Sequence, residues 1–199
     1  TNIVYMGMGE PMDNVDNILK SLEILTSDYG YAWSPKRVTV STVGLIPGLQ
    51  RFLKESKCHL AVSLHNPFSE ERLAMMPVEK AFKLEKVIDE IKKYDFTGQR
   101  RVSFEYTVFK GNNNLPRHAK MLATLLQGLE CRINLIRFHT IPNVDLEGAT
   151  DAEMLAFENL LRKNGLNATI RKSRGEDIFA ACGLLSSERN KEATNHPEN

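Results

Sequence analysis

Six short stretches rich in apolar and β-branched residues recur along this chain of 199 residues, and patterns typical of helices lie between them. Several stretches are apolar on consecutive residues, as expected of parallel strands buried on both faces. Strands that alternate with helices indicate βαβ units with right-handed crossovers, which build a doubly wound sheet or a barrel. The predicted strands cover residues 2–8, 37–42, 59–64, 101–109, 132–138 and 167–173.

The segments between the strands carry apolar residues at helical spacing. The last of them opens with Thr150 as a predicted N-cap and Glu153 as its capping-box partner, and it ends near Gly165. We therefore predict an α/β fold, a partial barrel of the TIM type with outer helices that lacks its first βα unit. The other helical stripes are Val15, Ile18, Leu22 and Leu25; Leu84, Val87, Ile88 and Ile91; and Ala119, Leu122 and Leu126.

The composition is that of one ordinary globular domain, with 42% hydrophobic and 26% charged residues. The net charge of +1 means that a nucleic-acid partner would need a local basic patch. No apolar run reaches membrane-spanning length, and three cysteines without a CxxC pair favour a reducing cytoplasm. The chain opens as a strand under way, so we expect a fragment of a longer protein, with a barrel domain over 1–185 and a disordered polar tail over 186–199.

In a parallel barrel, functional groups lie where the strands end. The first predicted strand ends in "GMGEP". Gly7 and Gly9 let the backbone approach a ligand closely, and Glu10 offers a carboxylate to an ammonium group. The alternative is a tight turn with a solvated Glu10.

The next two strands also end in polar residues. Ser41 and Thr42 could bind a ribose or a carboxylate, or cap the following segment. Ser63 and His65 should project to one side, with Leu64 opposite. A single histidine at a strand end is more often structural than a ligand-binding group.

The fifth strand contributes Asn134, Arg137 and His139 as polar candidates. Each is a weak signal by itself. Core packing does not call for polar groups at successive strand ends, so their shared position favours a binding site.

Near the end of the chain, the basic residues Arg171, Lys172 and Arg174 precede Cys182. The basic run could be a solvated strand end, or it could hold a nucleic-acid backbone. Cys182 lies between Ala181 and Gly183 and could be a small apolar filler or a reactive group.

Six sequence blocks in this order closely resemble the radical S-adenosylmethionine (SAM) RNA methyltransferases of the RlmN family, which modify carbon-2 of adenine in 23S rRNA and in tRNA. The resemblance runs from about residue 2 to about residue 185. The blocks are "GMGEPMDN", "STVGLIPG", "LAVSLHNP", "EYTVFKGNNN", "INLIRFH" and "RKSRGEDIFAACG".

The resemblance implies a radical SAM barrel, a 4Fe–4S cluster and two SAM molecules for each methyl transfer. The first SAM would methylate the cysteine that matches Cys182. The second would supply a radical that takes a hydrogen from the methylated cysteine, which then attaches to the adenine. Expected partners are 23S rRNA, tRNA and an electron donor such as flavodoxin.

By the same resemblance, Gly9 and Glu10 would hold the SAM amino group and Ser41 another polar part of SAM. The family commonly has Asn where this chain has His139. Arg171, Lys172 and Arg174 would contact RNA. The implied cofactor-binding residues are Gly9, Glu10, Ser41, Ser63, Leu64, His65 and His139.

The cluster in this family is held by a CxxxCxxC loop, which the sequence does not contain. We therefore expect no metal ligands in this chain and a fragment that is inactive alone. Cys58 and Cys131 are predicted core residues. The alternatives are carbon-8 methylation, as in the related Cfr enzymes, or a barrel remnant that binds RNA or a nucleotide without catalysis. A further alternative is an aldolase-like barrel. Such a barrel would need a strand-end lysine or a metal triad, and the sequence shows neither.

Overall fold

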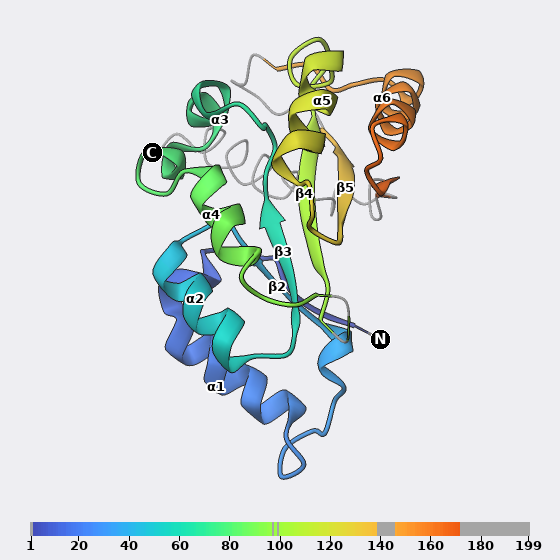
Figure 1. Ribbon diagram of the computed structural model, residues 1–199. Coiled ribbons are helices and arrows are strands. Elements are labelled where there is room, and N and C mark those ends of the chain that lie inside the picture. The colour runs from blue at the N-terminus through green and yellow to red at the C-terminus, as the bar shows by residue number, and fades with distance from the viewer. Residues whose placement is uncertain (1, 97, 99, 139–145, 172–199) are drawn as a thin grey trace, which may run out of the picture.

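The computed structural model describes residues 2–96, 98, 100–138 and 146–171, and its strands form one parallel sheet in chain order, β1-β2-β3-β4-β5-β6 (Figure 1). All six predicted strands are confirmed. The first is shorter than predicted because the chain turns away at the glycines after it. The strands are β1 (Ile3–Tyr5), β2 (Val38–Thr42), β3 (His59–Ser63), β4 (Val102–Val108), β5 (Cys131–Arg137) and β6 (Ala168–Ile170).

The predicted helical stripes are also found. At the start of α6, Thr150 Oγ1 accepts the Glu153 N–H at 3.3 Å and Glu153 Oε2 accepts the Thr150 N–H at 2.8 Å, which is the predicted capping box. The helices are α1 (Val15–Thr26), α2 (Ile46–Glu55), α3 (Ser69–Met75), α4 (Leu84–Ile91), α5 (Pro116–Leu125) and α6 (Asp151–Lys163), with 3₁₀ turns η1 (Pro11–Asn14), η2 (Pro35–Arg37) and η3 (Pro77–Lys80).

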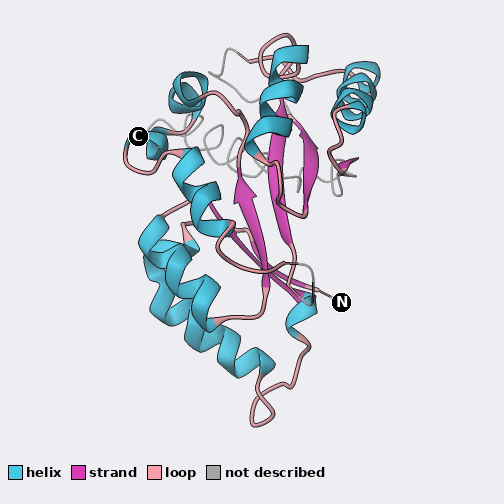
Figure 2. Ribbon diagram, viewed as in Figure 1, coloured by secondary structure: helices cyan, strands magenta, loops and turns pink. Residues whose placement is uncertain are grey.

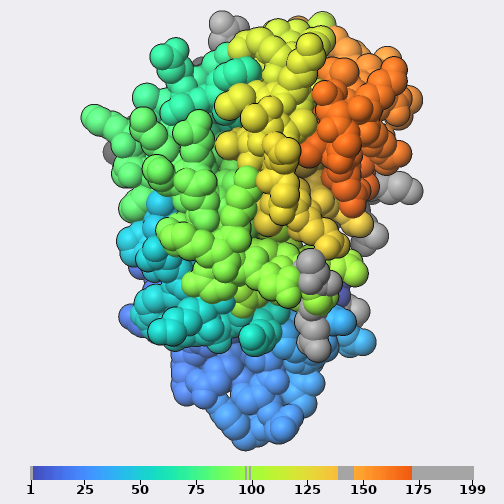
Figure 3. All heavy atoms as spheres, in the orientation of Figure 1, coloured from blue at the N-terminus to red at the C-terminus, as the bar shows by residue number. Residues whose placement is uncertain are grey.

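The helices cover one face of the sheet. Because each strand pairs with its predecessor through a right-handed crossover, the connecting helices fall on the same side, as in a barrel wall (Figure 2). The sheet does not close, since β1 and β6 lie at opposite ends of the strand order. The predicted partial barrel is therefore confirmed. On the surface, the segments lie in chain order, from α1 at the bottom of the view to α6 at the upper right (Figure 3).

The core lies between the sheet and these helices. Val40, Val62 and Phe104 are wholly buried on the sheet side, and Phe52 and Ile88 on the helix side. None of the helices in the described ranges is long and apolar enough to cross a membrane.

The opposite face of the sheet is polar. Strand register aligns Ser63 with Glu105, Glu105 with Asn134 and Asn134 with Thr169, so one polar row crosses four strands. Partners in parallel strands point to the same side. No helix of the described ranges covers this face, which we call the uncovered face, and a packed core does not require such a polar row.

Candidate functional site

The turn after β1 leaves its backbone open. Gly9 has a φ of +83°, a left-handed conformation that favours glycine. A Cβ built at Gly7 or Gly9 would meet no atom within 4 Å, and the side chain of Met8 between them is fully exposed. A ligand can therefore approach this turn closely.

The carboxylate of Glu10 joins this turn to the end of β2. Its Oε1 accepts hydrogen bonds from the Met12 N–H at 2.9 Å and the Thr42 hydroxyl at 2.7 Å. Its Oε2 accepts one from the Val43 N–H at 2.8 Å. A carboxylate has about four acceptor positions. Glu10 thus holds the turn together, and the described residues leave one acceptor position on its Oε2 unused.

The two hydroxyls that end β2 have different surroundings. Thr42 is buried, donates to Glu10 and accepts the Gly44 N–H at 2.9 Å, so it caps the turn. Ser41 is half-buried on the uncovered face, and its hydroxyl bonds to no other described residue. Of this pair, Ser41 is thus the residue whose hydroxyl the described residues leave unused, and its role in binding a ligand stays a prediction.

His65 follows β3 with a φ of +57°, which a non-glycine residue adopts only where its surroundings hold it. Its Nδ1 accepts the Thr107 N–H at 3.0 Å, so the neutral ring carries its proton on Nε2. Burial and the nearby Arg72 lower the pKa of His65 to about 4. At neutral pH this imidazole is an uncharged hydrogen-bond donor.

The other two predicted residues of this strand end differ from each other. The Ser63 hydroxyl bonds to no other described residue. The Leu64 side chain is wholly buried in the core, and its N–H donates to the Glu105 carbonyl at 3.0 Å. Leu64 thus serves the core, and its place in a ligand pocket stays a prediction.

A buried arginine connects the ends of β2 and β3. Arg72 of α3 is 0% exposed, and its Nη2 donates to the carbonyls of Val43 and Ser63, each at 3.0 Å. Its Nε donates to the Leu64 carbonyl at 3.0 Å. Glu79 pairs with Nη1 and balances the charge. Arg72 was not predicted from the sequence, because an arginine in "SEERLAMM" looks like part of a solvated helix face.

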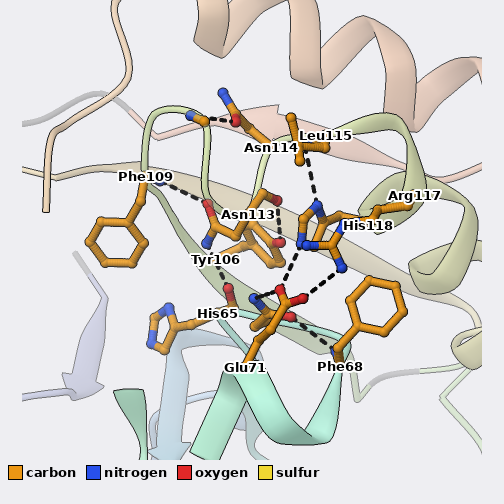
Figure 4. Close-up of polar contacts among 12 residues, drawn as sticks. His65, Phe68, Glu71, Tyr106, Phe109, Asn113, Asn114, Leu115, Arg117 and His118 are labelled. Atoms are coloured by element: carbon orange, nitrogen blue, oxygen red, sulfur yellow. Dashed lines mark hydrogen bonds and ion pairs between the residues drawn. The ribbon is translucent and has the colours of Figure 1, made fainter. Parts of the chain in front are cut away.

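A second polar network supports the residue after His65 (Figure 4). Glu71 Oε2 accepts from Asn66 Nδ2 at 2.9 Å and from His118 Nε2 at 3.0 Å, and Oε1 accepts from Arg117 at 2.6 Å. Burial acts to raise the pKa of Glu71, but the hydrogen bonds from His118, Arg117 and Asn66 outweigh it and lower the pKa to about 2. The loop after β3 is therefore fixed from both α3 and α5.

Glu105 lies at the centre of the polar row. Its Oε1 accepts from Asn134 Nδ2 at 2.7 Å and from the Ser103 hydroxyl at 3.2 Å. Its buried Oε2 accepts no hydrogen bond from the described residues, and Arg171 Nη1 lies 3.7 Å away. Glu105 was not predicted from the sequence, where its signal is the one charged residue in the middle of β4. A hollow of about 440 Å³ that Ser103 and Asn134 help to line lies towards the amino-terminal ends of the strands, and Glu105 is not among its lining residues.

Four predicted site residues, His139, Lys172, Arg174 and Cys182, lie outside the described residues. Arg171 is described, and its guanidinium faces Glu105 with its side chain 52% exposed. The predicted contact of Arg171 with RNA stays a prediction.

The cysteines in the described ranges are not arranged for a metal. Cys58 is buried and Cys131 half-buried, and neither belongs to a group of His, Cys, Asp or Glu that could hold an ion. Burial raises the pKa of the Cys58 thiol, and that of Cys131 to about 11, so both stay protonated at neutral pH. Cys58 is buried in the core as predicted, whereas Cys131, also predicted to be a core residue, lies at the margin of the core.

Solved structures share this fold, a parallel and open barrel wall. A radical SAM methyltransferase from Sphaerobacter thermophilus superposes with a TM-score of 0.86 at 39% identity, over 92% of this chain and 54% of that one. A domain of pyruvate-formate lyase-activating enzyme from Bacteroides vulgatus shares the fold, with a TM-score of 0.65 at 16% identity over 86% of this chain. The fold is that of the radical SAM enzymes.

The curated relatives are more specific. A protein of Parabacteroides distasonis named probable dual-specificity RNA methyltransferase RlmN is 65% identical over 96% of this chain and 55% of its own length. The dual-specificity RNA methyltransferase RlmN of Syntrophus aciditrophicus is 42% identical over 93% of this chain. These matches confirm the resemblance to the RlmN family. The chain spans about half the length of the curated relatives that it matches, and no family model matches it.

Proposed function

We propose that the protein containing this chain is a radical SAM RNA methyltransferase that adds a methyl group to carbon-2 of adenine in 23S rRNA and tRNA. The observation that carries the proposal is the set of strand ends, where Gly9 and Glu10 follow β1 and His65 follows β3 in a sheet like that of a radical SAM methyltransferase. The names of the relatives support RNA as the substrate.

The described residues fit SAM. Gly9 admits the ligand close to the backbone, and Glu10 Oε2 has an acceptor position for its ammonium group. His65 Nε2–H and the hydroxyls of Ser41 and Ser63 supply further hydrogen bonds. His139 belongs to the same proposed set. These groups would bind and orient SAM, and the imidazole of His65 stays neutral at neutral pH because its pKa is lowered to about 4.

The described residues do not fit a 4Fe–4S cluster, because they hold no group of thiolates. The cluster of the proposed enzyme must therefore be held by residues outside them. SAM and the cluster supply the methyl group and the radical chemistry, while the protein supplies binding and placement. No step can be assigned to the cluster from this part of the chain.

Cys182 is the proposed methyl carrier. Carbon-2 of adenine is electron-poor and cannot attack a methyl group as an ordinary nucleophile. A thiolate can take the methyl group with its own electron pair, and its sulfur then stabilises a radical on the attached carbon. Arg171, Lys172 and Arg174 would contact the RNA backbone nearby. An electron donor such as flavodoxin and a cytoplasmic location belong to the same proposal.

The test is the mass of the tryptic peptide 175–189, "GEDIFAACGLLSSER", from the full-length protein purified without oxygen from its own host. An added methyl group on Cys182 is expected. An unmodified thiol in protein with an intact cluster overturns the carrier role. Identifying which adenine carbon gains the methyl group then separates carbon-2 from carbon-8 chemistry.

A further inference from the structure

Three consecutive asparagines follow β4 and lie in different surroundings. Asn113 is 0% exposed, whereas Asn112 is exposed. Asn114 accepts the Gly111 N–H at 3.0 Å and so closes the turn (Figure 4). The buried member of the three is therefore the one whose contacts need a reason.

Asn113 uses its amide group on the backbone around His65. Its Nδ2 donates to the His65 carbonyl at 2.7 Å and to the Thr107 carbonyl at 2.8 Å. Its Oδ1 accepts the Phe109 N–H at 2.8 Å. Both amide donors are thus occupied, and Asn113 has none left for a ligand.

A second buried residue fixes Asn113 in turn. The Tyr106 hydroxyl donates to the Asn113 backbone carbonyl at 2.6 Å, and the Tyr106 side chain is 0% exposed. The asparagine is therefore held by its backbone as well as by its side chain.

These contacts meet at the strained residue of the rim. His65 has a positive φ, and its N–H donates to the Glu105 carbonyl at 3.3 Å. The Thr107 N–H binds the imidazole Nδ1, while the Thr107 carbonyl is bound by Asn113. The side-chain amide of Asn113 thus links the His65 carbonyl to Thr107, whose N–H fixes the orientation of the imidazole ring. This leaves Nε2 as the ring nitrogen for a ligand.

We propose that Asn113 is a positioning residue that holds the imidazole of His65 in place to donate from Nε2 to bound SAM. The inference rests on the proposed function, since it takes SAM as the ligand. Asn113 touches neither SAM nor the reacting atoms, and its effect passes through His65.

The experiment measures SAM affinity of the cluster-loaded, full-length protein by equilibrium dialysis without oxygen. Asn113→Ala is expected to weaken binding about tenfold, the value of one well-placed hydrogen bond. In a His65→Ala background the same change is expected to weaken binding less than about twofold, because the group that it positions is gone. Asn112→Ala, the matched control, should leave the affinity unchanged in both backgrounds.

Tyr106→Phe is the milder second variant if Asn113→Ala does not fold. It removes the hydroxyl that holds Asn113 and should give a smaller loss that again depends on His65. An equal loss with and without His65, or no loss, overturns the positioning role. If the parent protein itself does not bind SAM, the proposed function fails instead, so the two failures are distinguishable.

Discussion

The guanidinium of Arg72 donates to the carbonyl oxygens of Val43 and Ser63, each at 3.0 Å, and so bridges two neighbouring strand ends. A third hydrogen bond reaches Leu64, and Glu79 completes the buried pair. The backbone at the candidate site is therefore held in place by the fully buried guanidinium of Arg72.

Replacing Arg72 with methionine is expected to lower the free energy of unfolding by about 3–5 kcal/mol, because Glu79 is left as an uncompensated buried charge. Chemical denaturation of the full-length protein measures this loss. Arg51→Met is the control, since Arg51 pairs with Glu55 and Asp16 at the surface and should cost about 1 kcal/mol or less. Equal losses for the two variants would contradict the bridging role of Arg72.

The glycines near the site should respond differently to alanine. Gly7→Ala is expected to be nearly neutral, whereas Gly9→Ala should cost about 1 kcal/mol for its positive φ. Gly44→Ala combines a φ of +110° with a Cβ 2.8 Å from Val87 Cγ2, and should cost roughly 2–4 kcal/mol. Thermal unfolding of the three variants gives the order, and a Gly9 loss as large as that of Gly44 would disprove the open turn.

Glu71 should make the protein sensitive to acid. Its pKa is lowered from 4.5 to about 2 in the folded state, so its contribution to stability is present above pH 4.5 and is lost as the pH falls towards 2. Glu71→Gln is expected to flatten the pH dependence of unfolding in that window. Glu70→Gln, at the exposed neighbouring position, should leave the slope unchanged.

His65 should affect the stability of the protein at higher pH than Glu71 does. Its folded pKa of about 4 lies below the ordinary 6.5, so between these values the unfolded chain binds the proton and the folded chain does not. Stability is therefore expected to fall as the pH drops from 6.5 to 4 and to be unaffected by His65 above 6.5. His65→Gln should remove this part of the slope in urea titrations at several pH values; an unchanged slope would show that the imidazole is not buried in its neutral form.

The six strands were predictable because each leaves a short run of apolar and β-branched residues in the sequence, although the described helices cover one face of the sheet and the other face carries the polar row. Helix α2 was missed, since Pro47 and Gly48 in its first turn look like a loop signal. In the structure the proline begins the helix, and Gly48 packs against the Met12 carbonyl, where a Cβ would come within 2.1 Å. Local rules cannot anticipate such a close approach between distant segments.

Gly9, Glu10 and His65 could be proposed as site residues from the sequence because they follow the ends of predicted strands, and their binding role stays a prediction. The groups that hold them were not, because their partners are distant in sequence. Asn113 is 48 residues from His65, and Glu10 is 33 residues from Val43. Without coordinates, a buried asparagine looks the same as its exposed neighbour Asn112.

The polar row on the uncovered face has a consequence for how such a protein can change. Side chains on the helix-covered face form the core that stabilises the fold, whereas side chains such as Ser41 and Ser63 on the other face contribute no packing to that core. Substitutions on this polar face are expected to alter ligand recognition with little change in the free energy of unfolding. The two sides of one sheet are thus free to evolve at different rates.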